Sequence, residues 1–294
     1  MSRQELDSIH AELLARRTTP PTSLSEARDG YDRLCKRFPV PSQCTVNSSE
    51  LANVPAQIVE SSSPTRSILY VHGGGFLVGS AEGFSGIAGT LAVSSSATAY
   101  VLDYRLAPEH PYPAARNDVL DAYEEILKTQ PGSEIALVGD SAGAQLILSS
   151  LLEAKAKGIQ MPGCVVLLSP WVDLSLSGES IQTKASIDPF LSVEKLRGSA
   201  SAYLSGLSVD PLPILAADLK GLPPLLIQVG EEEILLDDAC ALARAAGAAG
   251  VEVTLEVWPK MFHVWHMFAP ALSEGRKAIA IAANFINSMT QGRS

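Results

Sequence analysis

The chain of 294 residues has few cysteines, and their spacing does not suggest a metal or redox site. The four cysteines, Cys35, Cys44, Cys164 and Cys240, are scattered, and no two of them are spaced as Cys-x-x-Cys. Neither a zinc site nor a redox pair is therefore indicated, and we expect free thiols that are mostly buried.

Long apolar runs and basic runs are also missing. No uninterrupted apolar stretch reaches the roughly 18 residues that a membrane-spanning helix requires. Residues 1–30 mix charged and polar positions with apolar ones, unlike a secretory signal. We therefore expect a cytoplasmic protein without stable membrane association. The net charge of −10 would repel phosphate backbones, so nucleic acid is not expected as a partner.

Apolar residues make up 46% of the chain, which is ample for the core of one large domain. Strand-like apolar runs recur, and helical patterns lie between most of them. This alternation favours a mainly parallel sheet with helices on both faces, in which sites lie at the carboxyl ends of the strands. The runs are 56–60, 67–71, 98–104, 135–138, 165–169, 225–229 and 251–257.

Two segments depart from this alternation. Residues 6–38 have apolar positions at helical spacing, interrupted at 18–21, which predicts two helices before the sheet begins. Residues 174–213 are richer in Ser and Gly, carry one helical pattern at 193–204, and end in Asp-Pro-Leu-Pro. We interpret them as an insertion that would form, with the N-terminal helices, a lid over the site.

Two glycine-rich motifs each follow a strand-like run, and together they outline a serine hydrolase site. Residues 139–143 read Gly-Asp-Ser-Ala-Gly, the nucleophile-elbow pattern, in which the chain turns tightly from strand into helix around Ser141. Residues 72–75 read His-Gly-Gly-Gly, whose backbone N–H groups, with that of Ala142, are natural oxyanion donors. A dinucleotide cradle is disfavoured, because its third glycine would fall at Val78.

A nucleophilic serine needs a base and a third group that orients the base. Of the five histidines, His10 lies in an N-terminal helix, His72 in the glycine motif and His110 in a Pro-rich loop. The remaining two, His263 and His266, follow the last strand, and the chain order of the hydrolase triad favours His263. A metal site on this pair lacks nearby carboxylate or thiolate ligands.

The third member should fall between serine and histidine, just past a strand. Five carboxylates follow the run at 225–229, and their spacing alone does not choose among them. They are Glu231, Glu232, Glu233, Asp237 and Asp238.

Three further features carry expectations of their own. Arg105 and Glu109, after another strand end, are expected to form an ion pair that braces their loop. Residues 169–173 are expected to have a similar structural role. An apolar cluster near the candidate base would either line an acyl pocket or pack in the core. It comprises Phe262, Trp265, Met267 and Phe268.

With these motifs in place, the chain resembles bacterial esterases of the hormone-sensitive lipase family, within the α/β-hydrolase superfamily. The resemblance covers nearly the whole chain. It rests on residues 72–75, 103–109 (Asp-Tyr-Arg-Leu-Ala-Pro-Glu), 139–143 and 169–171 (Ser-Pro-Trp), in the order that the family has them.

The resemblance implies an α/β-hydrolase fold with an eight-stranded, mostly parallel sheet, one antiparallel strand and a small helical cap. The implied parts are a cap segment at 1–45, the first part of the core at 46–173, a cap insertion at 174–213 and the second part of the core at 214–294. It also implies a homodimer through the last strand, at 251–257.

The resemblance further implies Ser141 as the nucleophile, His263 as the base, and the N–H groups of Gly74, Gly75 and Ala142 as oxyanion donors. The family's acid lies in a Gly-x-x-Asp-x-Leu-x-Asp pattern. Residues 230–237 match it with glutamate at the key position, so Glu233 is preferred to Asp237. A second departure is Val264, where many relatives have glycine.

The predicted activity is hydrolysis of short-chain acyl esters through an acyl-enzyme, with a small ester as substrate and neither metal nor organic cofactor. An amidase or formamidase with the same triad is the nearest alternative, because pocket shape rather than the motif chooses the leaving group. A non-catalytic small-molecule-binding protein on the same fold is an alternative from another class.

Overall fold

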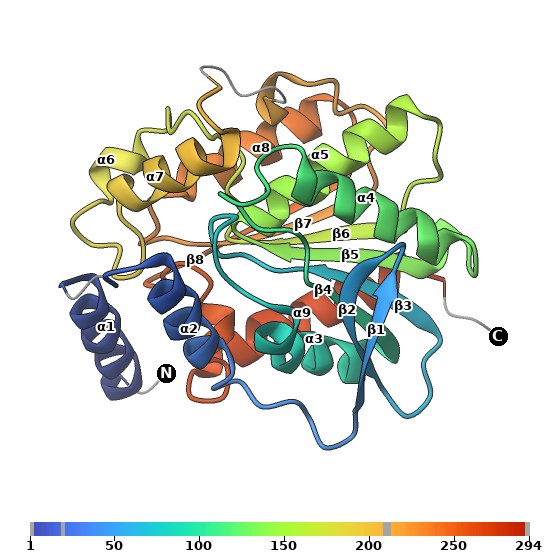
Figure 1. The fold of residues 1–294 in the computed structure, drawn as a ribbon, viewed down its shortest axis with the longest axis horizontal. Coiled ribbons are helices and arrows are strands. Elements are labelled where there is room, and N and C mark those ends of the chain that lie inside the picture. Colours follow the sequence, from blue (N-terminus) through green and yellow to red (C-terminus); the bar gives the residue numbers. More distant parts are fainter. Residues whose placement is uncertain (1–2, 19–20, 208–212, 292–294) are drawn as a thin grey trace.

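The computed structural model describes residues 3–18, 21–207 and 213–291, which form an eight-stranded sheet flanked by helices (Figure 1). The strand order is β1-β2-β4-β3-β5-β6-β7-β8, and β2 alone runs antiparallel to its neighbours. The expected sheet is therefore confirmed. The strands are β1 (Thr45–Leu51), β2 (Val54–Glu60), β3 (Arg66–Val71), β4 (Ala97–Leu102), β5 (Ile135–Asp140), β6 (Cys164–Leu168), β7 (Leu225–Gly230) and β8 (Val253–Trp258).

Burial explains which strands the sequence reveals. Every residue of β5, β6 and β7 is buried, so these central strands are covered on both faces and are largely apolar. The first strand, β1, forms a hairpin with β2, buries only Leu51 and exposes its other six residues, five of which are polar. It lacks an apolar run, and for that reason the sequence analysis did not include it.

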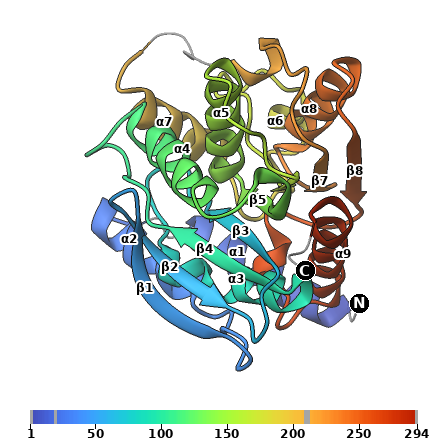
Figure 2. The ribbon, with the colours of Figure 1, turned by 90° about the vertical axis from the view of Figure 1, so that its right-hand side faces the viewer.

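Helices cover both faces of the sheet (Figures 1 and 2). One layer contains α3 (Ala81–Ser95) and α9 (Ser273–Met289), and the other contains α4 (Ala114–Leu127), α5 (Ala142–Ala156) and α8 (Leu236–Ala248). Alternate residues of a strand point to opposite faces. In β3, Ile68 and Tyr70 accordingly pack in one core, and Leu69 and Val71 pack in the other.

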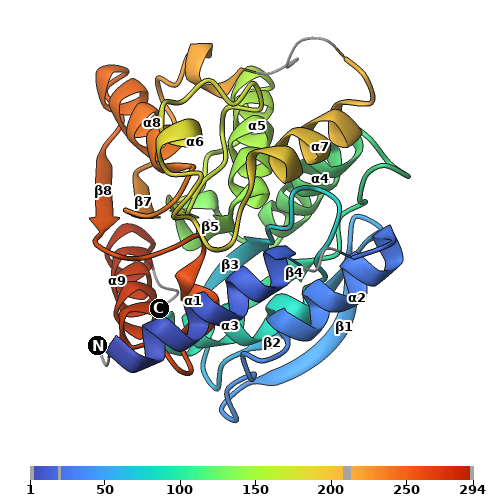
Figure 3. The same ribbon diagram turned by 90° about the vertical axis from the view of Figure 1, so that its left-hand side faces the viewer.

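Four helices lie at the end of the molecule that faces the viewer in Figure 3. Two are the expected N-terminal helices, α1 (Arg3–Thr18) and α2 (Leu24–Cys35); the others are the short α6 (Ser180–Thr183) and α7 (Val193–Leu204). The helix expected at 193–204 is confirmed, whereas α6 was not expected. Residues 19–20 and 208–212, which include most of the expected Pro-containing breaks, lie outside the described residues.

Short 3-10 helices complete the elements: η1 (Gly132–Glu134), η2 (Ile214–Ala216) and η3 (Trp265–Phe268). Within the described ranges, no helix has both the length and the apolar character that crossing a bilayer demands.

Candidate active site

Ser141 stands at the sharp turn between β5 and α5, as the elbow pattern predicts. Its backbone has φ 51° and ψ −120°, a conformation that residues other than glycine rarely adopt. Gly143, in the first turn of α5, lies so close to β3 that a Cβ there would come within 2.0 Å of the Val71 carbonyl oxygen. Glycine at 143 therefore lets the helix approach the sheet closely enough to form the turn.

Three of the predicted site residues meet through hydrogen bonds. Ser141 Oγ lies 3.0 Å from Nε2 of His263, and Nδ1 of the same imidazole lies 2.8 Å from Oε2 of Glu233. The side chains of His263 and Glu233 are 2% and 0% exposed. A buried serine, imidazole and carboxylate in series can pass a proton from the hydroxyl to the ring and stabilise the resulting imidazolium.

The other four carboxylates after β7 point elsewhere. Asp237, the alternative acid, accepts a 2.7 Å hydrogen bond from the backbone N–H of Ser180, and so joins α8 to α6. Glu231 binds Lys184, and Glu232 lies near His10. Asp238 accepts hydrogen bonds from the N–H groups of Val172 and Asp173.

The carboxylate of Glu233 is held by two further donors. Its Oε1 accepts hydrogen bonds of 2.6 Å from both Ser169 Oγ and the N–H of Gly230. The hydroxyl of Ser169 in turn accepts from the N–H of Val264, the residue after the imidazole. Ser169 thus ties Glu233 to the loop that carries His263, here called the histidine loop. The sequence analysis gave its segment only a bracing role; the position of Ser169 just after β6 was the available signal.

His266 lies apart from this chain of hydrogen bonds. It is fully buried, and its Nε2 is 3.0 Å from Oε1 of Gln228 in β7. Burial, and then repulsion from His263, lowers the pKa of His266 to about 3. A ring kept neutral in this way suits a packing role. Among the described residues, no group of three or more His, Cys, Asp or Glu side chains could hold a metal ion.

The glycine loop runs beside Ser141. Gly74 and Gly75 have φ of 114° and 60°, so both adopt conformations that glycine tolerates best. Within the part of the chain that the structure describes, the N–H groups of Gly74, Gly75 and Ala142 donate to no protein acceptor. They are therefore free to bind an oxyanion.

Asp140 fastens this loop to the elbow. Its Oδ1 accepts from the N–H of Gly73 at 2.9 Å and from the hydroxyl of Tyr70 at 3.1 Å. Burial raises the pKa of Asp140 to about 7, against the opposing effect of these two hydrogen bonds. Because Asp140, next to Ser141, holds Gly73, next to Gly74, the serine and the glycine loop keep a fixed relative position.

His72 supports the loop from its other side. Its ring stacks between Phe84 and Tyr104, at centroid distances of 5.3 and 4.3 Å. Its Nδ1 is 2.7 Å from the carbonyl oxygen of Gly73, and Tyr104 donates to the carbonyl oxygen of His72. Burial lowers the pKa of His72 to about 4, so the ring is neutral near pH 7 and serves as a structural support.

The residues at 103–109 make different ion pairs from the one expected. Arg105 binds Asp118 of α4, with Nη2 and Oδ1 2.6 Å apart, and Glu109 binds Arg28 of α2. The expected pair of Arg105 and Glu109 is therefore wrong. Both residues brace the loop, but through partners that are distant in sequence and that spacing does not reveal.

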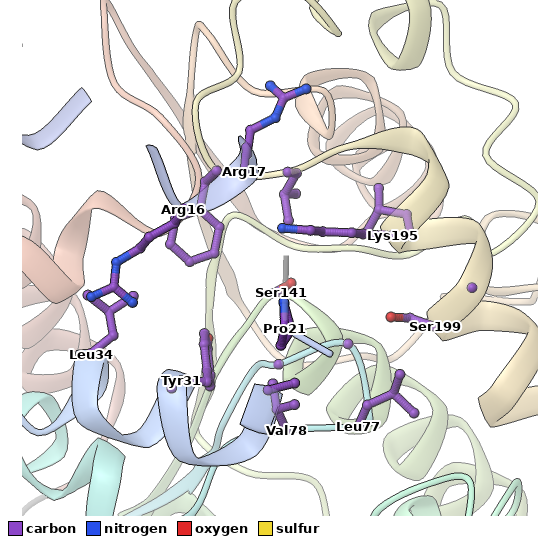
Figure 4. Close-up of a pocket in the computed structure, with 18 of the residues that line it drawn as sticks. Arg16, Arg17, Pro21, Tyr31, Leu34, Leu77, Val78, Ser141, Lys195 and Ser199 are labelled. Atoms are coloured by element: carbon purple, nitrogen blue, oxygen red, sulfur yellow. The ribbon is translucent and has the colours of Figure 1, made fainter. Parts of the chain in front are cut away.

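A cavity of about 540 Å³ opens above Ser141 and His263 (Figure 4). Its floor includes Gly74 and Gly75, and most of its walls come from α1, α2, α7 and the loop before α7. The apolar cluster at 262–268 belongs to the core beneath α3 and α9 and does not line this cavity. The core alternative for that cluster is therefore the correct one.

Asp188 connects the segment before α7 to the loop that carries Glu233, and no sequence pattern marked it. Its buried carboxylate accepts from the N–H groups of Phe190 and Leu191 and, at 3.0 Å, from the N–H of Ile234. The turn made in this way places the ring of Phe190 5.7 Å from that of His263. Burial raises the pKa of Asp188.

The fold and its strand-turn-helix serine define an α/β hydrolase, and comparison with known proteins agrees. The model of the α/β-hydrolase-fold family matches residues 68–267. An acetyl-hydrolase of Streptomyces hygroscopicus is 44% identical over 230 residues, 76% of each chain. An esterase of Acinetobacter venetianus is 34% identical over 268 residues, which are 89% of this chain and 88% of that one.

Solved structures narrow the family further. The crystal structure of an esterase from the bacterial hormone-sensitive lipase family superposes with a TM-score of 0.95 at 38% identity, over 99% of this chain and 100% of that one. A hormone-sensitive lipase from a metagenome library gives 0.93 at 37% identity, over 97% and 98%. The chain belongs to the α/β-hydrolase-fold family and, within it, to the bacterial hormone-sensitive lipase esterases. It is a carboxylic ester hydrolase.

Proposed function

We propose that the protein hydrolyses short-chain acyl esters with Ser141 as nucleophile, His263 as general base and Glu233 as the orienting acid. The observation that carries this proposal is the buried series of hydrogen bonds from Ser141 Oγ through the imidazole to Glu233 Oε2. Such a series activates a hydroxyl that is otherwise a poor nucleophile.

In the first step, Ser141 Oγ attacks the ester carbonyl carbon while Nε2 of His263 takes the hydroxyl proton. The carbonyl oxygen becomes an oxyanion facing the N–H groups of Gly74, Gly75 and Ala142. Collapse of this intermediate expels the alcohol, which receives the proton from His263. Water then attacks the acyl-enzyme with the same assistance, which releases the carboxylic acid and restores the serine.

The oxyanion donors and the acid contribute in different ways. Each donor of this kind lowers the barrier by about 3–4 kcal/mol, because it is already oriented toward the developing charge. Glu233 holds the ring tautomer that leaves Nε2 free to accept a proton and stabilises the charged ring, without taking the proton itself.

We further infer that residues 1–45 and 174–213 form a cap over a core made of residues 46–173 and 214–294. In support, the cavity of about 540 Å³ lies between these two parts of the chain. A cavity of this size, covered on one side by α1, α2 and α7, has the dimensions of a small-molecule site, which supports a small ester as the substrate.

A series of p-nitrophenyl esters of increasing acyl length tests the substrate class, with a matching anilide for the amidase alternative. We expect turnover to be highest for short chains and the anilide to be hydrolysed far more slowly. Ser141→Ala should abolish hydrolysis of every ester, whereas a variant that retained wild-type turnover would exclude Ser141 as the nucleophile. Preference for the anilide would favour an amidase.

The acid is tested by comparing Glu233→Gln with Asp237→Asn. We expect Glu233→Gln to lower kcat by several orders of magnitude. The neutral amide can hold the imidazole in the wrong tautomer, and it does not stabilise the positively charged ring. Asp237→Asn should affect mainly the junction of α6 and α8. The reverse ranking of kcat would mean that Asp237 is the acid.

We also propose a homodimer that forms through β8. This strand ends the sheet order, so one of its edges has unpaired backbone groups, and Val257 on it is 42% exposed. Light scattering after size exclusion should give twice the chain mass of 31.1 kDa. Val257→Lys should shift the protein toward the monomer, and a wild-type mass of one chain would exclude the dimer.

A further inference from the structure

The lining of the cavity has the opposite charge to the protein as a whole. The chain carries a formal net charge of −10. Among the described residues that line the cavity, four carry a positive charge, and Glu26 is the single carboxylate. The positive residues are Arg16, Arg17, Arg33 and Lys195.

Two of these cations have acidic neighbours within the protein. Arg16 Nη2 lies 3.2 Å from Oε1 of Glu12, its neighbour on α1. Hydrogen bonds from Thr22, and to a smaller extent the charge of Arg33, lower the pKa of the exposed Glu26 carboxyl, so Arg33 too has a carboxylate on its own helix. Arg16 and Arg33 are therefore the weaker candidates for binding a ligand anion.

The other two cations, Arg17 and Lys195, come from different cap helices and lie near each other. Arg17 donates one N–H to the backbone carbonyl of Asp188, a neutral acceptor. Lys195 makes no ion pair with any described residue. Desolvation, and then repulsion from Arg17, lowers the pKa of Lys195.

Acidic groups near this pair are occupied or face solvent. The carboxylate of Asp188 accepts hydrogen bonds from the backbone N–H groups of Phe190, Leu191 and Ile234. Glu194 is exposed, and hydrogen bonds from its own backbone N–H and from Ser192, followed by the charges of Arg197 and Arg17, lower the pKa of its carboxyl. Neither carboxylate forms an ion pair with Lys195 within the described part of the chain.

Lys195 also lies at a position of its helix that does not favour a positive charge. Ser192 caps α7 and accepts from the N–H of Lys195, so Lys195 occupies the third position of the helix. That position favours a glutamate, which completes a capping box, and the positive end of the helix dipole disfavours a cation. Figure 4 shows Lys195 extending from this helix over the space above Ser141.

We propose that Arg17 and Lys195 bind the anionic group of the substrate, so that the enzyme prefers esters that carry a carboxylate or a phosphate beneath the cap. The inference rests on the proposed esterase function and names its substrate class. Both residues line the cavity, and in Figure 4 Lys195 lies above Ser141 with the Arg17 guanidinium on its far side. An anion that enters from that side would meet both a planar fork of donors and a point charge.

Matched pairs of esters test the preference. On the acyl side, mono-4-nitrophenyl adipate is compared with neutral 4-nitrophenyl hexanoate. On the alcohol side, the acetyl esters of 3-hydroxybenzoate and of 3-hydroxyphenyl phosphate are compared with that of methyl 3-hydroxybenzoate. We expect kcat/KM to favour the anionic member in at least one set, by about tenfold at low salt. The set that shows the preference tells whether the anion belongs to the acyl or to the alcohol part of the substrate, and whether it is a carboxylate or a phosphate.

The variants are chosen to change charge with little change of shape. Lys195→Met and Arg17→Gln should each lower the ratio of anionic to neutral kcat/KM about tenfold, a change of ~1.4 kcal/mol. Lys195→Arg should retain the ratio. Lys220→Met, which removes an exposed lysine outside the cavity lining, is the matched control and should also retain it. Circular dichroism checks that Arg17→Gln remains folded.

Salt provides a second readout. Raising the salt to about 0.5 M should shrink the wild-type preference, because the mouth of the cavity is open to screening. A wild-type enzyme that hydrolyses the neutral esters with no preference for any anionic one would overturn the inference and leave the proposed function standing. Loss of the preference in Lys220→Met as much as in Lys195→Met would also overturn it. Hydrolysis that survives in Ser141→Ala would instead refute the proposed function.

Discussion

Ser169 Oγ donates to Glu233 Oε1 at 2.6 Å, in a pocket that excludes solvent from both side chains. We predict that Ser169→Ala lowers kcat about ten- to a hundredfold with little change in KM, because the acid and the histidine loop lose their common partner. Steady-state kinetics on a short p-nitrophenyl ester measure both constants.

The backbone of Ser169 supplies the control for this prediction. Its φ of 48° strains any residue that has a Cβ, serine and alanine alike, and is easy for glycine. Ser169→Ala therefore removes the hydroxyl at unchanged backbone strain, and Ser169→Gly removes it while relieving that strain. Both variants should lose kcat to a similar extent. If either kept wild-type turnover, the hydroxyl would not be needed, and Ser169 would not be a positioning residue.

A second prediction separates the two histidines after β8. His263→Ala should abolish turnover, whereas His266→Ala should change kcat by less than about tenfold. Deleting the buried ring of His266 leaves a cavity and an unpaired oxygen on Gln228, so the free energy of unfolding should fall by about 2–4 kcal/mol. Urea unfolding and kinetics on the same preparations measure the two effects, and a loss of turnover without a loss of stability in His266→Ala would contradict this assignment.

The sequence predicts the parts of this protein that follow from local pattern. The central strands are apolar runs, and the elbow serine is marked by glycines that close packing requires, so both could be found without coordinates. The strand β1 could not, because it lies in an exposed hairpin and buries only Leu51. The choice of Glu233 over Asp237 needed the resemblance to a family, since the five carboxylates follow the same strand.

Contacts between segments that are distant in sequence could not be predicted from local patterns. Arg105 and Glu109 are four residues apart in sequence, but their partners Asp118 and Arg28 are set by how α4 and α2 pack on the loop. Val264 shows a different case. Its φ of 50° is costly for a β-branched side chain and easy for glycine, so the valine is a departure that the sequence pattern alone does not explain. Its N–H donates to Ser169 Oγ at 3.0 Å, which helps to hold the loop that carries His263 in this conformation.

The third prediction concerns pH and Asp140. Burial raises the pKa of Asp140 from 3.8 to about 7 in the folded protein. The folded state therefore binds this proton more tightly than the unfolded chain, and the resulting stabilisation is complete below about pH 4 and lost as the pH rises to about 7. Asp140→Asn cannot ionise. Relative to wild type, its free energy of unfolding should rise by about 2 kcal/mol between about pH 5 and about pH 8.

Denaturant titrations of both proteins across this pH range make the comparison. Asp238 is also buried and has its pKa raised to about 7, but it is present in both proteins, so its contribution cancels in the difference. The asparagine side chain retains an oxygen that can accept from Gly73. Parallel stability curves for the two proteins would show that Asp140 does not titrate between these pH values.

The last prediction concerns the attachment of α2 to the cavity wall. Arg28 donates to the carbonyl oxygens of Leu77 and Ala107, at 2.9 and 3.2 Å, and to both carboxylate oxygens of Glu109. The ion pair is exposed and should contribute no more than about 1 kcal/mol, so Glu109→Gln should have a small effect. Arg28→Ala also leaves the two carbonyl groups without their donor. Because Leu77 lines the cavity, Arg28→Ala should raise KM about five- to tenfold and lower the melting temperature, while kcat falls less. Equal effects of Glu109→Gln and Arg28→Ala on KM would mean that the ion pair, rather than the carbonyl contacts, holds the helix in place.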